Sequence, residues 1–392
     1  MDTFFTRVKG DKVIWAVLVL LSLFSILIVY SSTGALAYKF KGGNTEAFLV
    51  KHLVTYFVAF GIVFFVHKIK YTFFSRISQL MVFVAAPLLL FTLLKGVSSG
   101  DATRWLAIPG TSLTFQTSDF AKVALIMYLA RTLAVKQDMV GDFKKMMDFK
   151  NGILPILGPV FLICGLILPA NFSTAAVLFF SCFILMFIGR VNAKFLLLIV
   201  ASGIIAFGLF LLVVFAFPNV SNRVSTWKAR IESFSSGNSE ENYQAEQAMI
   251  AIATGGPLGK GPGKSTQRNF LPQASSDFIY AIIIEEYGMI FGGFFILLLY
   301  LILLLRSVRI VTKSDKNFGS FLAIGLSTSM VIQGLINMAV AVHIFPVTGQ
   351  PLPFVSMGGT SLWFSSFALG VILSVSKEFE LSKKEGGKLE TA

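Results

Sequence analysis

Ten blocks of apolar residues, each long enough to cross a lipid bilayer as a helix, dominate this sequence. About 30 Å of hydrocarbon needs roughly 20 helical residues, and only helices and closed barrels satisfy their own backbone groups in lipid. The alternating segments typical of barrel strands are absent. The sequence therefore predicts an all-α polytopic membrane protein with spans near residues 13–33, 47–66, 77–95, 118–135, 152–169, 174–189, 195–217, 277–305, 318–344 and 361–376.

Composition and the N-terminal segment agree with this class. Of the 392 residues, 55% are hydrophobic and 14% are charged, against about 25% charged residues in soluble domains. Arg7, Lys9 and Lys12 precede the first apolar block, which is longer than the core of an ordinary signal peptide. We expect it to be a retained first helix, within one integral membrane domain that covers residues 1–392.

The distribution of Lys and Arg predicts the orientation. Of the 33 basic residues, 21 lie in or beside segments that share a side with the N-terminus, and 11 lie in or beside the others. The positive-inside rule then places both termini in the cytoplasm, with a tail at 377–392. This asymmetry accounts for the net charge of +13, so no nucleic-acid partner is predicted.

This topology leaves a long external loop at 218–276 and shorter ones at 96–117 and 345–360. Helical apolar spacing at 224–234 and 243–253 predicts two helices along the membrane surface, with a solvated loop as the alternative.

The segment 345–361 holds three prolines and three glycines, so it cannot continue a helix. We expect a rigid re-entrant stretch that borders a cavity, because irregular backbone at membrane depth must be buried in protein or wetted. A simple connector is the alternative.

Cysteine and histidine offer no structural cross-link. Cys164 and Cys182 lie within apolar blocks, and His52, His67 and His343 are far apart without the spacing of metal ligands. Neither a disulfide nor a metal cage built from His or Cys is expected.

Ionisable residues within spans are costly and usually face a cavity or a partner. Asp119 and Lys122 lie three residues apart on one face of the fourth span. Asp277 opens the eighth span at its outer end, where a carboxylate meets both solvent and a lipid-borne molecule. Glu285 and Glu286 are expected deeper in that span, in helix packing or cavity polarity. A structural ion pair between Lys122 and one of these glutamates is the alternative.

The glycine-rich stretch 255–267 invites comparison with the phosphate-binding P-loop. With GKS at 263–265 in the last three positions, the first required glycine falls on Leu258, so the match fails. The loop could still hold an anion through its amides together with Lys260, Lys264 and Arg268. A flexible surface loop is the alternative.

Four ordered blocks resemble the SEDS family, of the FtsW/RodA type. LPQASSDFIYA at 271–281, followed by EEYG at 285–288, resembles the family's LPEAHTDFIFA…EELG. RWL at 104–106 with FQTSDFAK at 115–122 is similar to its RRW…FQPSExaK. The stretch 255–267 matches its glycine-rich loop, and 346–361 its PvtGlpLPFiSyGGSS. Ten spans with both ends inside also fit, so the resemblance covers nearly the whole chain.

The resemblance implies a peptidoglycan glycosyltransferase that polymerises lipid II, an undecaprenyl-pyrophosphate disaccharide peptide, at the outer face of the plasma (inner) membrane. It implies a class B penicillin-binding protein as transpeptidase partner, alongside other division proteins. KGDK at 9–12 and SDFIY at 276–280 are more like the division branch, FtsW, than the elongation branch, RodA.

The family's essential aspartate falls on Asp277, expected to act as a general base or to hold a divalent cation (Mg or Mn). Asn171 stands where the family carries an aspartate, so no base is expected there. Basic residues are expected to stabilise the departing pyrophosphate. The expected substrate-binding residues are Arg104, Lys122, Arg223, Lys264, Gln267, Ser356, Gly358 and Gly359, and the expected cavity residues are Asp119, Glu285 and Glu286.

Two other functions stay open. A lipid II flippase would need polar groups near mid-bilayer that are accessible from both sides, whereas the polar residues here are predicted at the outer third. A scaffold that only recruits the transpeptidase would tolerate replacement of Asp277.

Overall fold

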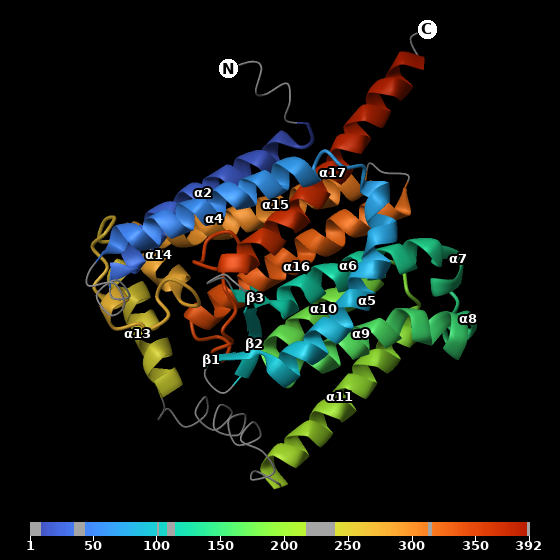
Figure 1. The fold of residues 1–392 in the computed structure, drawn as a ribbon, viewed down its shortest axis with the longest axis horizontal. Helices are drawn as coiled ribbons and strands as arrows, with labels where there is room; N and C mark the ends of the chain where they lie inside the picture. Colours follow the sequence, from blue (N-terminus) through green and yellow to red (C-terminus); the bar gives the residue numbers. More distant parts are fainter. Residues whose placement is uncertain are drawn as a thin grey trace.

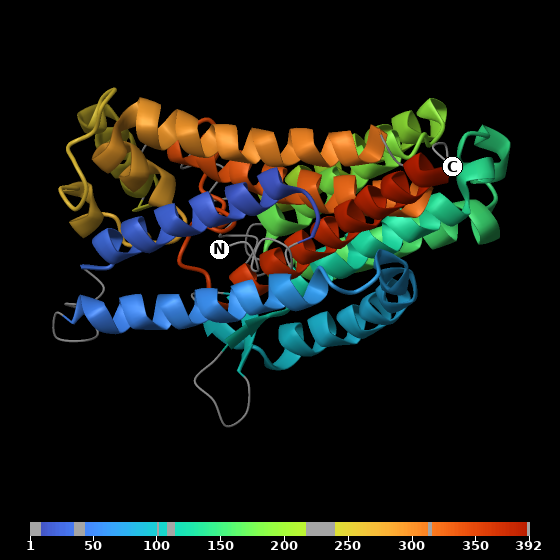
Figure 2. The ribbon, with the colours of Figure 1, turned by 90° about the horizontal axis from the view of Figure 1, so that it is seen from above.

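The computed structural model describes residues 9–34, 44–99, 102–107, 114–216, 240–312 and 316–389. Its long helices lie side by side in one bundle (Figures 1 and 2). Each predicted span overlaps one or more helices. The long helices are α2 Lys12–Ser32, α4 Thr45–Val66, α5 Tyr71–Lys95, α6 Thr117–Val135, α9 Leu154–Ile167, α10 Phe172–Ile188, α11 Ala193–Ala216, α15 Phe295–Thr312, α16 Asn317–Ala341 and α17 Gly359–Leu389.

The helices confirm a multi-span membrane protein. Among the described residues, seven helices are long and apolar enough to cross a membrane, and α10 and the first part of α11 are shorter apolar helices. The polar α6 belongs to neither group, so the count of ten spans stays a prediction. Helix α16 lies at the centre of the bundle. In its most apolar stretch of 18 residues 78% are buried, against 28% in the corresponding stretches of α4 and α5.

Asp11 ties together the ends of three helices. Its Oδ1 caps α2 by accepting from the amides of Val13 and Ile14 at 2.8 and 3.2 Å. Its Oδ2 pairs with Arg306 of α15 at 2.5 Å, and its own amide donates to Ser376 of α17 at 3.0 Å. The start of α2 and the late parts of α15 and α17 therefore share one end of the bundle.

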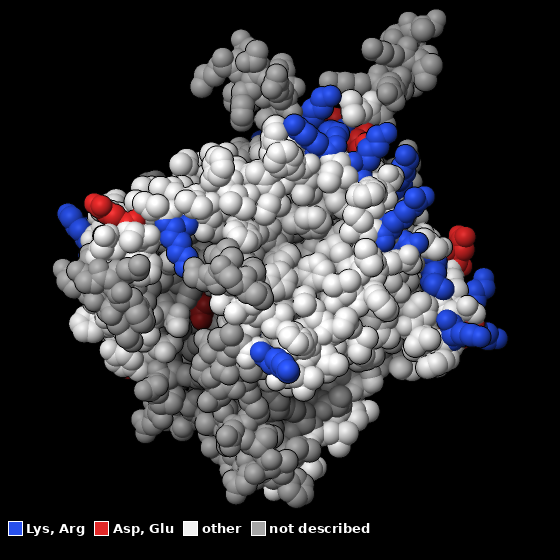
Figure 3. All heavy atoms as spheres, viewed as in Figure 1, with Lys and Arg blue, Asp and Glu red and all other residues white. Residues whose placement is uncertain are grey.

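Basic side chains on the visible face gather along one edge, near the two chain termini and around α7 Gln137–Val140 and α8 Phe143–Met146 (Figure 3). The exposed lysines at this end include Lys9, Lys12, Lys68, Lys70, Lys144 and Lys145. This distribution is the one that a cytoplasmic end requires. The orientation itself stays a prediction.

The predicted external segment 96–117 contains a small antiparallel sheet that the sequence analysis did not anticipate. Strands β1 Val97–Ser99, β2 Ala102–Ala107 and β3 Thr114–Gln116 pair in the order β1-β2-β3, with Trp105 opposite Gln116. The sheet joins the end of α5 to the start of α6, and it carries Arg104 on its middle strand.

The predicted span 277–305 is not one continuous helix. A short helix, α14 Ile279–Gly288, ends at Gly288, whose φ is +78°, and the π-helix η3 Met289–Phe294 then leads into α15. A side-chain carbon at Gly292 would lie 2.8 Å from the carbonyl oxygen of Ile283. Nine residues of continuous helix would separate these positions by about 13 Å, so the chain reverses at Gly288.

This reversal corrects the predicted depths of three acidic residues. Glu286 accepts a hydrogen bond from Ser31, in the last turn of α2. The carbonyl of Ser276, beside Asp277, accepts a hydrogen bond from Ser356, and the carbonyl of the neighbouring Val355 accepts one from Ser25. Ser25 lies six residues before Ser31 on α2. Asp277 therefore lies about 9 Å further from this end of the bundle than Glu286. The expectation that Glu285 and Glu286 lie deeper than Asp277 was wrong.

Helix α13 Glu240–Gly255 confirms the helix predicted at 243–253, whereas 224–234 lies outside the described residues. The loop after α13 pairs directly with the end of α14 and the start of η3. The amides of Lys260 and Gly261 donate to the carbonyls of Glu285 and Glu286, both at 2.9 Å, and that of Met289 donates to Gly256 at 2.9 Å.

We expect Gly259→Ala to lower the thermal unfolding midpoint of the purified protein in detergent. Gly259 has φ +82°, and a side-chain carbon there would overlap the backbone of Glu286 and Gly288. Overpacking of this kind costs about 1–3 kcal/mol. Gly263→Ala is the matched control, because Gly263 has φ +74° with open space around it. Equal losses in the two variants would contradict close packing of this loop on α14.

Candidate active site

The segment 345–358 confirms the prediction of irregular backbone between the ninth and tenth spans, and its residues 352–356 are buried. It enters the bundle deeply. The carbonyl of Pro353 accepts the hydroxyl of Tyr300, in the second turn of α15, and the carbonyl of Val355 accepts that of Ser25 of α2 at 2.7 Å. Gln350 and Ser356 are buried. The stretch is therefore re-entrant, and not a surface connector.

Asp277 precedes α14, and hydrogen bonds to the backbone at 276–277 join it to this re-entrant segment. Asn337 of α16 donates its amide to the carbonyl oxygens of both Asp277 and Gln350, at 2.8 and 2.7 Å. Ser356 donates to the carbonyl of Ser276 at 2.6 Å. Two segments far from Asp277 in the sequence, α16 and the re-entrant segment, thus fix its position.

The side chain of Asp277 faces Arg104 across a glycine. A side-chain carbon at Gly349 would lie 3.5 Å from Oδ2 of Asp277 and 3.9 Å from Nη1 of Arg104. The φ of Gly349 is +64°, and Arg104 is anchored by a bond from Nε to the carbonyl of Ala170 at 3.1 Å. Gly349 therefore lies beside both the carboxylate and the guanidinium, at contact distance from each.

Burial sets the protonation of Asp277, which lies in the connection between α13 and α14. It raises the pKa of this carboxyl to about 6, against the opposing effects of a hydrogen bond with Ser276 and the charge of Arg104. A carboxylate with this pKa is ionised at neutral pH and basic enough to accept a proton from a hydroxyl in a transition state.

Helix α10 closes the site beside the re-entrant segment. The Oδ1 of Asn171 caps this helix by accepting from the amide of Thr174 at 3.1 Å, and Gln350 donates its side-chain amide to the hydroxyl of Thr174. Asn171 thus has a structural role as the N-cap of α10, which needs no acid.

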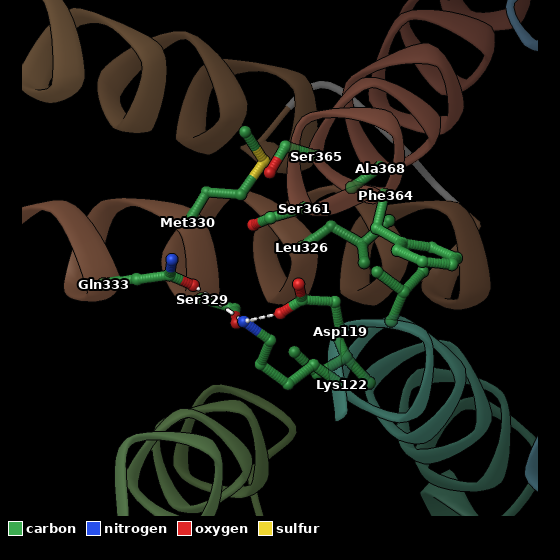
Figure 4. A pocket seen from close by; sticks show the side chains of 12 residues that line it. Asp119, Lys122, Leu326, Ser329, Met330, Gln333, Ser361, Phe364, Ser365 and Ala368 are labelled. Carbon is green, nitrogen blue, oxygen red and sulfur yellow. Dashed lines mark hydrogen bonds and ion pairs between the residues drawn. The ribbon is translucent and has the colours of Figure 1, made fainter. Parts of the chain in front are cut away.

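Asp119 and Lys122 form a second polar group on α6 (Figure 4). Their ion pair is 2.8 Å long, and Nζ of Lys122 also donates to Oε1 of Gln333 on α16 at 3.0 Å. Gln333 in turn donates to the carbonyl of Pro351 at 2.9 Å. The alternative ion pair of Lys122 with Glu285 or Glu286 is therefore wrong, and Lys122 is joined to the re-entrant segment instead.

A small cavity of about 30 Å³, enough for one or two water molecules, borders this ion pair. Oδ2 of Asp119 is buried and has no hydrogen-bond partner in the described part of the chain. The cavity wall combines serine hydroxyls from α16 and α17 with apolar side chains; its polar residues are Asp119, Lys122, Ser329, Gln333, Ser361 and Ser365. Its polar groups supply both donors and acceptors to whatever small polar group lies beside the ion pair.

The glycine-rich loop binds carboxylates of the protein itself. Lys260 pairs with Glu285 at 2.6 Å, and the amides of Thr266 and Gln267 donate to Glu285 at 3.1 and 3.3 Å. The amide of Gly263 donates to Glu286 at 3.0 Å. These amides are committed to the end of α14, so the hypothesis that they cradle an external anion was wrong.

The structure therefore divides the predicted substrate-binding residues into groups. Arg104 faces Asp277, and Lys122 reaches the same re-entrant segment through Gln333. Ser356 supports the Asp277 loop through Ser276, and Gly358 and Gly359 lie where α17 begins. Lys264 is exposed in the loop at the far end of α14, and Gln267 bonds there to Glu285. Arg223 lies outside the described residues.

Four polar residues of the site escaped the sequence analysis: Gln333, Asn337, Gln350 and Thr174. A signal for two of them was available. Gln333 and Asn337 lie four residues apart inside an apolar span, so they share one helix face, and uncharged polar groups in a span also need partners. Gln350 and Thr174 carried no comparable pattern.

An apolar groove of about 810 Å³ lies next to the polar cavity, between α4, α5, α6 and α17. Phe364 lines both, so an aromatic wall separates them. The groove is lined by hydrophobic and aromatic side chains, among them Phe57, Phe65, Phe73, Phe74, Phe120, Trp363 and Phe367.

Solved structures share this fold. The chain aligns with one in a peptidoglycan synthase complex at a TM-score of 0.70 and 20% identity, covering 94% of this chain and 98% of that one. The rod shape determining protein RodA of Thermus thermophilus aligns at a TM-score of 0.64 and 21% identity, covering 94% and 97%.

Sequence relatives match over nearly the full length. The stage V sporulation protein E of Bacillus subtilis is 32% identical, covering 95% of this chain and 98% of that protein. A probable peptidoglycan glycosyltransferase FtsW of Trichlorobacter lovleyi is 32% identical, covering 97% of each. Residues 11–381 match the family described as cell cycle protein, which unites FtsW, RodA and SpoVE. Together with the four sequence blocks, these matches show that the chain belongs to the FtsW/RodA/SpoVE family.

Proposed function

We propose that this protein is a peptidoglycan glycosyltransferase that polymerises lipid II at the outer face of the plasma (inner) membrane. The observation that carries the proposal is Asp277, a half-buried carboxylate with a pKa near 6 that faces Arg104 and is held by α16 and the re-entrant segment. Relatives named as probable peptidoglycan glycosyltransferases support the reaction class.

Asp277 acts in this proposal as the general base. It accepts the proton of the acceptor sugar's hydroxyl while that oxygen attacks the anomeric carbon of the donor. The bond from this carbon to the pyrophosphate oxygen breaks, and its electron pair leaves with the polyprenyl pyrophosphate. General-base catalysis of this kind contributes about 10²–10⁴-fold.

Arg104 and Lys122 are the cations proposed to meet the departing pyrophosphate. Arg104 lies beside Asp277, and Lys122 projects into the polar cavity next to the apolar groove. A lipid chain in the groove would bring its head group to the wall formed by Phe364. Fixed positive charge at the site of developing negative charge stabilises a transition state without reorganisation.

A divalent cation is part of the proposal only if it binds together with the substrate. No group of three or more His, Cys, Asp or Glu that could hold a metal occurs among the described residues. A Mg²⁺ or Mn²⁺ ion would therefore rely on Asp277 together with pyrophosphate oxygens, an arrangement common for Mg²⁺. Its chemistry there would be to neutralise charge on the leaving group.

We further propose a role in septal wall synthesis, with a class B penicillin-binding protein as transpeptidase partner and other division proteins nearby. The curated relatives named FtsW support the division role, and the synthase complex in which polymerisation and crosslinking are coordinated supports such a partner. A fluorescent fusion at division sites, with undivided cells on depletion, would be the expected result. Loss of rod shape with normal septa would favour an elongation role.

The test of the activity is incubation of purified lipid II with this protein, alone and with its cognate transpeptidase, followed by gel analysis of labelled glycan chains. Chains are expected from wild type. No chains in either case, together with lipid II translocation in proteoliposomes, would replace the polymerase by a flippase.

Asp277→Asn is expected to reduce the polymerisation rate by about 10²–10⁴-fold, because the amide cannot accept the proton. The rate is compared at matched expression and thermal unfolding midpoint. Asp148→Asn is the control. It neutralises an exposed aspartate on the other side of the bundle, whose Oδ1 accepts from the amide of Lys150. An asparagine can make the same capping bond. Full activity of Asp277→Asn would exclude Asp277 as the base and favour a scaffold.

The rate is also expected to fall as the pH drops through about 6, because the raised pKa of Asp277 leaves the carboxyl protonated below that value. Arg104 lowers this pKa, so Arg104→Gln should move the midpoint of the pH profile to a higher pH. Rates of chain formation between about pH 5 and 8 give both midpoints. Identical midpoints would contradict the proximity of Arg104 to the catalytic carboxylate.

A further inference from the structure

Three consecutive carbonyls of the re-entrant segment accept hydroxyl groups from three different helices. Tyr300 of α15 donates to Pro353, Tyr56 of α4 donates to Phe354, and Ser25 of α2 donates to Val355 at 2.7 Å. All three donors are buried. None of them takes part in the chemistry proposed for Asp277.

A histidine, His52, completes this set of side chains. We call Tyr300, Tyr56, Ser25 and His52 together the clamp. Nε2 of His52 lies 2.9 Å from the hydroxyl oxygen of Ser25, and the His52 ring packs edge-on against Tyr56 at 4.9 Å between centroids. The hydroxyl proton of Ser25 is committed to Val355, so Nε2 of His52 must carry the proton and donate it to Ser25. His52 and Tyr56 are one turn apart on α4, so one helix face presents both groups.

The held backbone is strained where the hydroxyls grip it. Phe354 has φ +60°, a left-handed conformation that non-glycine residues rarely adopt. Such a conformation persists only where its surroundings determine it. One hydroxyl bonds to the carbonyl of Phe354 itself, and one bonds to the carbonyl of each neighbouring residue. Together these three bonds hold the conformation in place.

The next residues connect the clamp to Asp277. Ser356 Oγ accepts from the amide of Leu352 at 2.8 Å and donates to the carbonyl of Ser276 at 2.6 Å. The amide of Met357 donates to the carbonyl of Ser275 at 2.8 Å. A shift of residues 353–355 is therefore transmitted, through one or two bonds, to the loop that carries Asp277.

We propose that Tyr56, Tyr300 and the Ser25–His52 pair are positioning residues that fix the aim of Asp277 toward Arg104. The inference rests on the proposed polymerase activity. Its physical basis is that a displacement of about 1 Å at a catalytic group can cost about 10²-fold in rate, even when its cause is remote.

Tyr300→Phe and Tyr56→Phe test the clamp, since each removes one hydroxyl and keeps the packed ring. Each is expected to lower kcat for polymerisation about ten- to a hundredfold, with KM for lipid II nearly unchanged, as for an interaction needed only in the transition state. Hydrogen exchange at the amides of 350–357 should become faster.

Tyr128→Phe is the matched control. Tyr128 donates its hydroxyl to the carbonyl of Pro155 at 3.1 Å, a bond of the same kind between α6 and the start of α9, away from the re-entrant segment. It should leave kcat and the exchange at 350–357 unchanged. His52→Gln keeps an amide donor and should retain most of the rate that His52→Leu loses.

Wild-type chain formation with full kcat in both Tyr→Phe variants would overturn the positioning role. Equal kcat losses in Tyr128→Phe would also overturn it, because the effect would then be general destabilisation. If wild type forms no chains, the proposed function fails, but hydrogen exchange still tests whether the clamp holds the re-entrant segment. Unchanged exchange at 350–357 in the Tyr→Phe variants would then reject the clamp.

Discussion

An irregular backbone segment buried in a helical bundle can exist only if its polar groups find partners, because an unpaired carbonyl away from water costs several kcal/mol. Every carbonyl from 350 to 355 meets this requirement. Those of Gln350 and Pro351 accept side-chain amides from α16, and that of Leu352 accepts the amides of Val355 and Ser356. The other three accept hydroxyls from α15, α4 and α2. The position of Asp277 depends on this set of bonds.

Features encoded locally were predictable from the sequence. Block length predicts the helices, three prolines in 345–361 predict the re-entrant stretch, and the spacing of Asp119 and Lys122 predicts a shared face. The reversal at Gly288 was not predictable in this way, because a glycine within an apolar run leaves hydropathy unchanged. Pairing of the short strands around Arg104 and of the glycine-rich loop with Glu285 depends on non-local contacts, which periodicity does not report.

The acidic residues around α14 differ in role because their surroundings differ. Glu285 receives Lys260, two hydroxyls and backbone amides, so its lone pairs are occupied by the protein. Asp277 lies near the charge of Arg104, and its pKa is raised to about 6. The first arrangement closes a turn at the end of α14. The second gives a carboxyl with a perturbed pKa beside a cation, which is the pattern of a chemical carboxylate.

The packing below the polar cavity bears on the choice between polymerisation and transport. Gly325 lies eight residues from Gln333 on α16, about 12 Å along the axis toward the predicted cytoplasmic end. A side-chain carbon there would lie 2.9 Å from Leu185 and 3.0 Å from Ile126, so α6, α10 and α16 are in close apolar contact at this level. In this conformation a polar head group would meet a dry barrier below Lys122. Close packing of this kind opposes passage of a head group across the bilayer, so it favours the proposed polymerase over a flippase.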